Sequence, residues 1–95
     1  MTTTDPREAD ICAWLAGQRE AMVKLLEDVV NVDSGSYDKA GVDAVGARFE
    51  AFFAAHGMPT AREANETFGD AIHVRLDDQP SNEPPIVLMG HRDTV

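Results

Sequence analysis

Apolar residues recur along the first third of the chain at steps of three and four. They are Ile11, Trp14, Leu15, Met22, Leu25, Leu26, Val29 and Val30. This spacing places one apolar stripe along an α-helix, on which Gln18 is the single polar position. Asp5 suits the cap of such a helix and Pro6 its first turn, while Glu8 lies three residues beyond the cap. The pattern predicts an amphipathic helix from Asp5 to Val30 with one buried face.

The stretch NVDSGSYDKAG interrupts this pattern with a cluster of turn-forming residues. It does not fit a calcium-binding loop, because Gly35 and Tyr37 stand where oxygen-bearing side chains are needed. It also lacks the G-x-S-x-G arrangement of a nucleophile elbow. We therefore expect a connector in which Ser34 and Ser36 are ordinary loop residues.

A second helix is predicted after the connector. Its apolar face would consist of Val42, Val45, Phe49, Phe52 and Phe53. The helix should end at the sequence HGMP, where Gly57 can adopt the left-handed cap and Pro59 prevents continuation. His56 would then lie in the last turn, where the helix dipole favours a cation, and we expect no metal role for it.

The remainder of the chain has the pattern of strands. TARE, from Thr60, is a short candidate, and AIHVRL alternates apolar and polar residues as a half-buried strand does, with His73 on the polar side. DDQPSNEPP contains three prolines and predicts a turn. IVLM, Ile86 to Met89, is apolar at every position, as in a central strand covered on both faces. The order predicts an α/β fold of two N-terminal helices followed by about three strands.

Composition limits the possible partners. Hydrophobic residues make up 43% of the 95 residues, enough for a core, and the formal net charge is −9. Such an acidic chain repels nucleic-acid phosphates and anionic lipid surfaces, so we expect neither nucleic acid nor a membrane as a partner. The lone Cys12 cannot form an internal disulfide, and we expect it to be a small buried apolar group. The start of the sequence lacks the features of a secretory signal, and no apolar run has the length of a membrane span, so a cytoplasmic location is expected.

The sequence GHRD, which follows the IVLM strand, carries the candidate chemistry. Side chains at the carboxyl end of a central strand are well placed to bind ligands in α/β proteins. Gly90 lets the backbone leave the sheet without a side-chain clash. His91 can offer an imidazole nitrogen to a metal, and Asp93, two residues on and on the same side of an extended chain, can accept the other ring N–H.

The segment LMGHRDTV after an apolar strand resembles the first metal-site motif of the zinc-dependent aminoacylase/glutamate carboxypeptidase-type metallopeptidase family. LLEDVVNVDSGSYDKAGVDAVGARF is similar to the opening of the same family, closest to its glutamate carboxypeptidase branch. The resemblance covers residues 20–95. It implies that His91 ligates zinc and that Asp93 orients this ligand and is catalytic, whereas Arg92 stands at a variable position and is assigned no chemistry.

The family uses two zinc ions and further ligands that should follow this motif. A catalytic zinc needs about three protein ligands, and His91 supplies one. We therefore expect residues 1–95 to be the N-terminal fragment of a metallopeptidase or amidohydrolase catalytic domain, without the family's dimerisation domain. The intact relative would hydrolyse a peptide or N-acyl amino acid next to a free carboxylate, and the isolated chain is expected to be inactive.

Two alternatives stay open. The chain can be a non-catalytic remnant or interaction module that pairs with a complementary chain through an exposed sheet edge. It can also be a small unrelated α/β domain whose ending mimics the motif. In that case Ile86 to Met89 would be buried within its own sheet and no metal dependence would be found.

Overall fold

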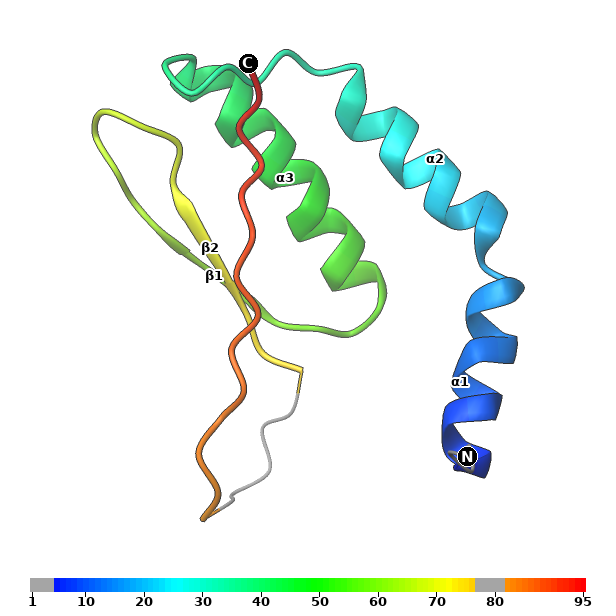
Figure 1. Ribbon diagram of the computed structural model, residues 1–95. Helices are drawn as coiled ribbons and strands as arrows, with labels where there is room; N and C mark the ends of the chain where they lie inside the picture. The colour runs from blue at the N-terminus through cyan, green and yellow to red at the C-terminus, as the bar shows by residue number, and fades with distance from the viewer. Residues whose placement is uncertain (1–4, 77–81) are drawn as a thin grey trace. The chain divides into compact units, whose positions relative to one another are not determined.

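The computed structural model describes residues 5–76 and 82–95 (Figure 1). The chain divides into two compact units, Met1–Asn31 and Val32–Val95. Among the described residues, the first unit contains helices α1 and α2, and the second contains helix α3 and strands β1 and β2. The predicted α/β class is therefore confirmed. None of the helices in the described ranges is both long enough and apolar enough to span a bilayer.

The first unit contains two helices where the apolar pattern predicts one. α1 spans Pro6–Ala16 and α2 spans Arg19–Val30. The start is as predicted, since the Asp5 side chain caps α1 by accepting a hydrogen bond from the Arg7 main-chain nitrogen at 2.8 Å. The break falls at Gly17 and Gln18, because glycine is a poor helix former and the Gly17 N–H closes the last turn of α1 on Ala13 and Trp14.

Two expectations for this unit are wrong. Neither α1 nor α2 has a buried residue, so the predicted buried face is not formed within the described chain. Cys12, expected to be buried, is an exposed free cysteine. A pair of short helices has no enclosed interior of its own, and side chains such as Trp14 are 62% exposed.

The second unit begins with a loop and continues into α3, Lys39–Ala55. Asp38 caps this helix by accepting a hydrogen bond from the Gly41 main-chain nitrogen at 3.0 Å. Val42 and Val45 are the buried hydrophobic residues of the core. The predicted end is confirmed, because Gly57 follows the helix with a φ of +72°, in the left-handed region that favours glycine.

A two-stranded antiparallel sheet follows α3. β1, Thr60–Glu63, pairs with β2, Ala71–Val74, in a register that sets Thr60 opposite Val74. Both predicted strands are therefore confirmed, and α3 lies against both of them. A hairpin packed on one helix buries little apolar surface, so polar contacts between the helix and the hairpin help to fix their arrangement.

One such contact is an ion-pair network that joins α3 to the β1–β2 loop. Lys39 Nζ lies 2.9 Å from Asp43 Oδ2 and 2.9 Å from Asp70 Oδ1, and the Asp70 main-chain nitrogen donates to Asp43 Oδ1 at 2.8 Å. Arg62, on β1, adds a contact of 3.2 Å to Asp70 Oδ2. The hydrogen bond from the Asn65 main-chain nitrogen, followed by that from Lys39, lowers the pKa of Asp70 to about 2.

The third predicted strand is not formed in the described chain. Ile86 to Met89 were expected to lie in a central strand, yet they have no strand partner among the described residues, and their exposed fractions run from 71% to 92%. A central strand needs a hydrogen-bonded neighbour on each side. The sheet of the described chain consists of β1 and β2 paired with each other, and neither of them pairs with residues 86–89. The predicted turn before it lies partly outside the described residues.

Candidate functional site

The C-terminal segment, residues 90–95, is held against the loop that precedes α3. The contacting residues Ser34 and Thr94 are 60 positions apart in the sequence. The Thr94 main-chain nitrogen donates to the Ser34 carbonyl oxygen at 2.7 Å, and Gly35 and Thr94 form an isolated parallel bridge. Ser34, only 3% exposed, donates from Oγ to the Arg92 carbonyl oxygen at 3.2 Å. Ser34 is therefore a buried anchor of the segment and not the ordinary loop residue that the sequence predicted.

His91 and Asp93 face each other at the end of this segment. His91 Nδ1 lies 3.1 Å from Asp93 Oδ1 and 3.0 Å from the Asp93 carbonyl oxygen. Both oxygens can only accept, so Nδ1 carries the proton and donates it. In the neutral imidazole this leaves the lone pair on Nε2, which has no hydrogen-bond partner among the described residues. The side chain of His91 is 84% exposed, so Nε2 is open to a ligand from solvent.

Ser36 holds the other side of the same carboxylate. Its Oγ donates to Asp93 Oδ2 at 2.5 Å, so that Asp93 accepts from Ser36 with one oxygen and from His91 with the other. The hydrogen bond from Ser36 is the largest of the effects that lower the pKa of Asp93 below its ordinary value, and the His91 hydrogen bond acts in the same direction. Asp93 is therefore an ionised acceptor at neutral pH.

Arg92 points away from this pair and anchors the segment to the rest of the unit. Its Nε donates to the Val42 carbonyl oxygen at 3.1 Å, and its Nη2 donates to the Asp70 carbonyl oxygen. Alternation along an extended chain accounts for this, since side chains two apart share a side and the one between them takes the opposite side. The residue to which the sequence assigned no chemistry thus fixes the orientation of both its neighbours.

A pocket of about 350 Å³ lies at this point of the second unit. Its lining residues are Ser36, Val42, Phe68, Gly69, Asp70, Ala71, Gly90, His91, Arg92 and Asp93. The pocket combines the His91–Asp93 pair with an aromatic side chain and a stretch of main chain around Gly69. Polar groups that converge on a partly apolar hollow are what a small-molecule site requires.

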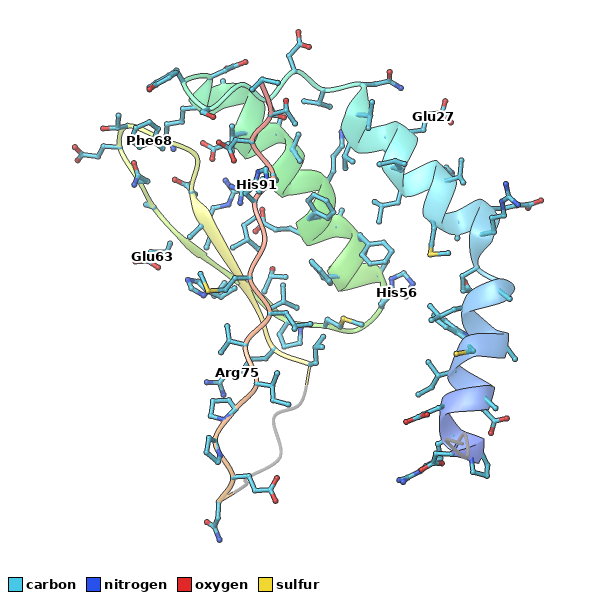
Figure 2. The ribbon with its side chains drawn as sticks, viewed as in Figure 1. Glu27, His56, Glu63, Phe68, Arg75 and His91 are labelled. Atoms are coloured by element: carbon cyan, nitrogen blue, oxygen red, sulfur yellow. The ribbon has the colours of Figure 1, made fainter. Side chains whose placement is uncertain are left out.

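The other two histidines lie elsewhere, as the sequence predicts. His56 caps α3, with Nδ1 2.8 Å from the Phe52 carbonyl oxygen. His73, on β2, is exposed and pairs through Nε2 with Glu63 Oε2 at 3.0 Å. Figure 2 shows His91 on the C-terminal segment, whereas His56 lies at the far end of α3. Neither histidine therefore completes a ligand set with His91.

His91 is the candidate metal ligand of this site among the described residues. Across the described ranges there is no group of three or more His, Cys, Asp or Glu side chains that could hold a metal ion. The donor set suits one imidazole ligand with a carboxylate behind it.

Gly90, which was expected to let the backbone leave the sheet, is not required there. A Cβ at this position would meet nothing within 4 Å, and the φ of Gly90 is not positive.

No protein-family model, no curated protein and no solved structure matches this chain.

Proposed function

We propose that this chain is the N-terminal portion of a zinc-dependent exopeptidase or amidohydrolase of the glutamate carboxypeptidase type. In this proposal His91 is a metal ligand and Asp93 is a catalytic residue. The observation that carries it is the hydrogen bond from His91 Nδ1 to Asp93 Oδ1, at 3.1 Å. Metal-ligating histidines commonly donate the other ring N–H to a carboxylate in this way.

The residues of the chain have defined roles in this proposal. Asp93 fixes the tautomer of the His91 imidazole and raises its basicity. It also stabilises the positive charge that the imidazole acquires when it binds a metal. Arg92 holds the backbone between them through Val42 and Asp70. Two bound zinc ions, as in the resembling family, would supply polarisation of the amide carbonyl and activation of water.

The proposed substrate class follows from the resemblance, and the presence of a pocket at His91 supports the proposal. A peptide or an N-acyl amino acid, cleaved next to a free carboxylate, is the substrate that the glutamate carboxypeptidase branch implies. The pocket of about 350 Å³ beside His91 has the size of a small-molecule site. A catalytic zinc needs about three protein ligands, so about two more for the ion bound by His91, and the full set for a second ion, are proposed to come from outside the described residues.

Binding of Zn²⁺ alone tests the ligand assignment. The three histidines are followed by NMR through their ring signals while Zn²⁺ is added to the 95-residue chain. His91 should respond at the lowest metal concentration, and His91→Ala should remove that response. His73→Ala is the matched control, because His73 is also an exposed histidine beside a carboxylate, but it engages Glu63 through Nε2. A response at His73 or His56 that precedes the one at His91 would contradict the assignment.

An activity assay tests the proposed reaction. Because His91 is one of about three ligands that catalytic zinc needs, the chain with added Zn²⁺ should give no turnover of N-acyl-glutamate substrates. Robust turnover that His91→Ala abolishes would overturn the proposed inactivity while supporting the metal assignment. We place this activity in the cytoplasm, on the grounds of the sequence alone.

A second candidate function is an interaction module that pairs with a complementary chain. The exposure of Ile86, Leu88 and Met89, each 88% or more exposed, favours it, because a run of large apolar side chains in water promotes association. Sedimentation of the purified chain distinguishes the two candidates. A monomer at all concentrations, with zinc bound at His91, argues against the interaction module.

A further inference from the structure

We infer that Ser36 is a positioning residue for His91: its hydroxyl holds the Asp93 carboxylate in the orientation that keeps the imidazole proton on Nδ1 and leaves Nε2 free for a ligand. The identity of that ligand as zinc rests on the proposed function. The effect on the imidazole does not, because it follows from the contacts of the three side chains.

The Asp93 carboxylate is held at both of its oxygens. Asp93 uses both oxygens, with Oδ2 accepting from Ser36 Oγ at 2.5 Å and Oδ1 accepting from His91 Nδ1 at 3.1 Å. A carboxylate held at one oxygen can rotate about its last side-chain bond, which is a broad torsion. A second hydrogen bond on the other oxygen removes that freedom, and a hydroxyl donor to an ionised acceptor is among the strong ones.

The orientation of the Asp93 carboxylate affects which ring nitrogen of His91 carries the proton. A neutral imidazole carries its proton on one ring nitrogen, and the hydrogen bond made by that nitrogen decides which one it is. His91 is 84% exposed, so water offers hydrogen bonds to both nitrogens and selects neither. Among the described residues Asp93 discriminates between them, because its carbonyl oxygen lies 3.0 Å and its carboxylate Oδ1 3.1 Å from Nδ1. Anything that fixes Asp93 therefore fixes the nitrogen that remains available to a metal.

Main-chain hydrogen bonds of neighbouring residues position Ser36, without involving its side chain. The Asp38 main-chain nitrogen donates to the Gly35 carbonyl oxygen at 2.8 Å, and Thr94 N donates to the Ser34 carbonyl oxygen at 2.7 Å. The Ser36 side chain is exposed, and its hydroxyl bonds to Asp93. Removing its hydroxyl should therefore leave the loop and the C-terminal segment in place, which separates positioning from folding.

The experiment compares variants of the 95-residue chain by NMR of the histidine ring nitrogens. It is done in mildly alkaline solution, where each ring carries a single proton and its tautomer can be read. In the natural sequence the His91 proton should lie on Nδ1. Ser36→Ala should shift population towards the Nε2–H form, and Ser36→Thr should restore the Nδ1–H form because it keeps the hydroxyl. Asp93→Ala marks the loss of the whole carboxylate, while the main-chain carbonyl oxygen at 3.0 Å from Nδ1 stays.

A second measurement adds Zn²⁺ to the same variants. Loss of a group that orients a ligand typically weakens metal binding 10-fold to 100-fold. We expect Ser36→Ala to weaken the Zn²⁺ response of His91 by about 10-fold, while Ser36→Thr stays within about 2-fold of the natural chain. The Thr94 amide, which bonds to Ser34, reports whether the segment is still in place.

Each outcome is decisive. If Ser36→Ala leaves the tautomer unchanged while Asp93→Ala alters it, the inference is overturned. It is also overturned if Ser36→Ala exposes the Thr94 amide to exchange, because Ser36 would then act on folding. If the natural chain binds no Zn²⁺ at His91, the proposed function loses its metal ligand, and the tautomer comparison alone decides the role of Ser36.

Discussion

Arg92 Nε donates a hydrogen bond to the Val42 main-chain carbonyl oxygen at 3.1 Å, joining the C-terminal segment to the first turns of α3. The same guanidinium reaches the Asp70 carbonyl oxygen at the start of β2. One side chain thus ties together the segment that carries His91, the helix and the hairpin. Arginine suits this place because its planar fork serves two acceptors in fixed directions.

Replacement of Arg92 should destabilise the second unit. Hydrogen bonds to a charged group contribute about 1.5–3 kcal/mol, so Arg92→Ala should lower the free energy of unfolding by about that amount. Arg92→Lys should recover only part of it, because an ammonium group cannot match the fork. Urea denaturation measures the effect. Arg75→Ala, which changes an exposed arginine after β2, is the control and should stay close to the natural chain.

Acid should weaken the second unit through Asp70. The pKa of its carboxyl is about 2 in the folded chain against an ordinary value of 3.8, so between these two pH values the folded state binds fewer protons than the unfolded state. The stability contributed by Asp70 is therefore fully present above about pH 4 and is lost as the pH falls through 2. Asp70→Asn should flatten this part of a stability–pH curve obtained from denaturation at several pH values. Asp10→Asn, which removes an exposed carboxylate on α1 in the other compact unit, is the control measured alongside.

The buried and the exposed apolar positions should respond differently to truncation. Val45 is 2% exposed, so Val45→Ala should cost about 2 kcal/mol through lost burial and the cavity left behind. Leu88 is 88% exposed, so Leu88→Ala should change the free energy of unfolding by less than about 0.5 kcal/mol. Chemical denaturation of both variants provides the comparison. A large loss with Leu88→Ala would mean that this side chain is covered.

Two glycines should differ in their tolerance of a side chain. Gly57 has a φ of +72°, so Gly57→Ala should destabilise the end of α3 by about 1 kcal/mol although nothing obstructs the new methyl group. Gly90 has open space and no positive φ, and Gly90→Ala should be neutral within about 0.5 kcal/mol. Thermal melts of the two variants test this contrast. Equal losses would show that Gly90 is constrained by something other than its backbone angle.

The sequence predicted those elements whose cause is local. Asp5 caps α1, Gly57 follows α3 in the left-handed conformation, and the strand that begins at Thr60 pairs with AIHV, because caps, glycine angles and alternation act over a few residues. The break at Gly17 has a local cause as well, but the apolar stripe continues through it and masks it. The apolar run at 86–89 predicted a strand because continuous apolarity describes the preference of the side chains for burial and not the presence of a neighbouring strand.

The candidate site was predictable only in part. The spacing of His91 and Asp93 indicates that they share a side, and the structure brings them to within 3.1 Å. Ser34 and Ser36 could not be found in the same way. Their partners lie 57 to 60 residues further along the chain, and no local spacing reports such a contact. The role of Arg92 was missed because the sequence does not show which groups face the side of the segment opposite His91 and Asp93.

The parallel bridge between Gly35 and Thr94 sets an order of events in folding. Closing a chain loop of this size loses more conformational freedom than forming a helical turn or a hairpin, and the hydrogen bonds of Ser34, Ser36 and Arg92 stabilise it only once the loop has closed. Helix α3 and the hairpin should therefore form first and provide the surface on which the last residues settle. The His91–Asp93–Ser36 arrangement would then be the slowest part of the unit to appear during refolding and the earliest to come apart.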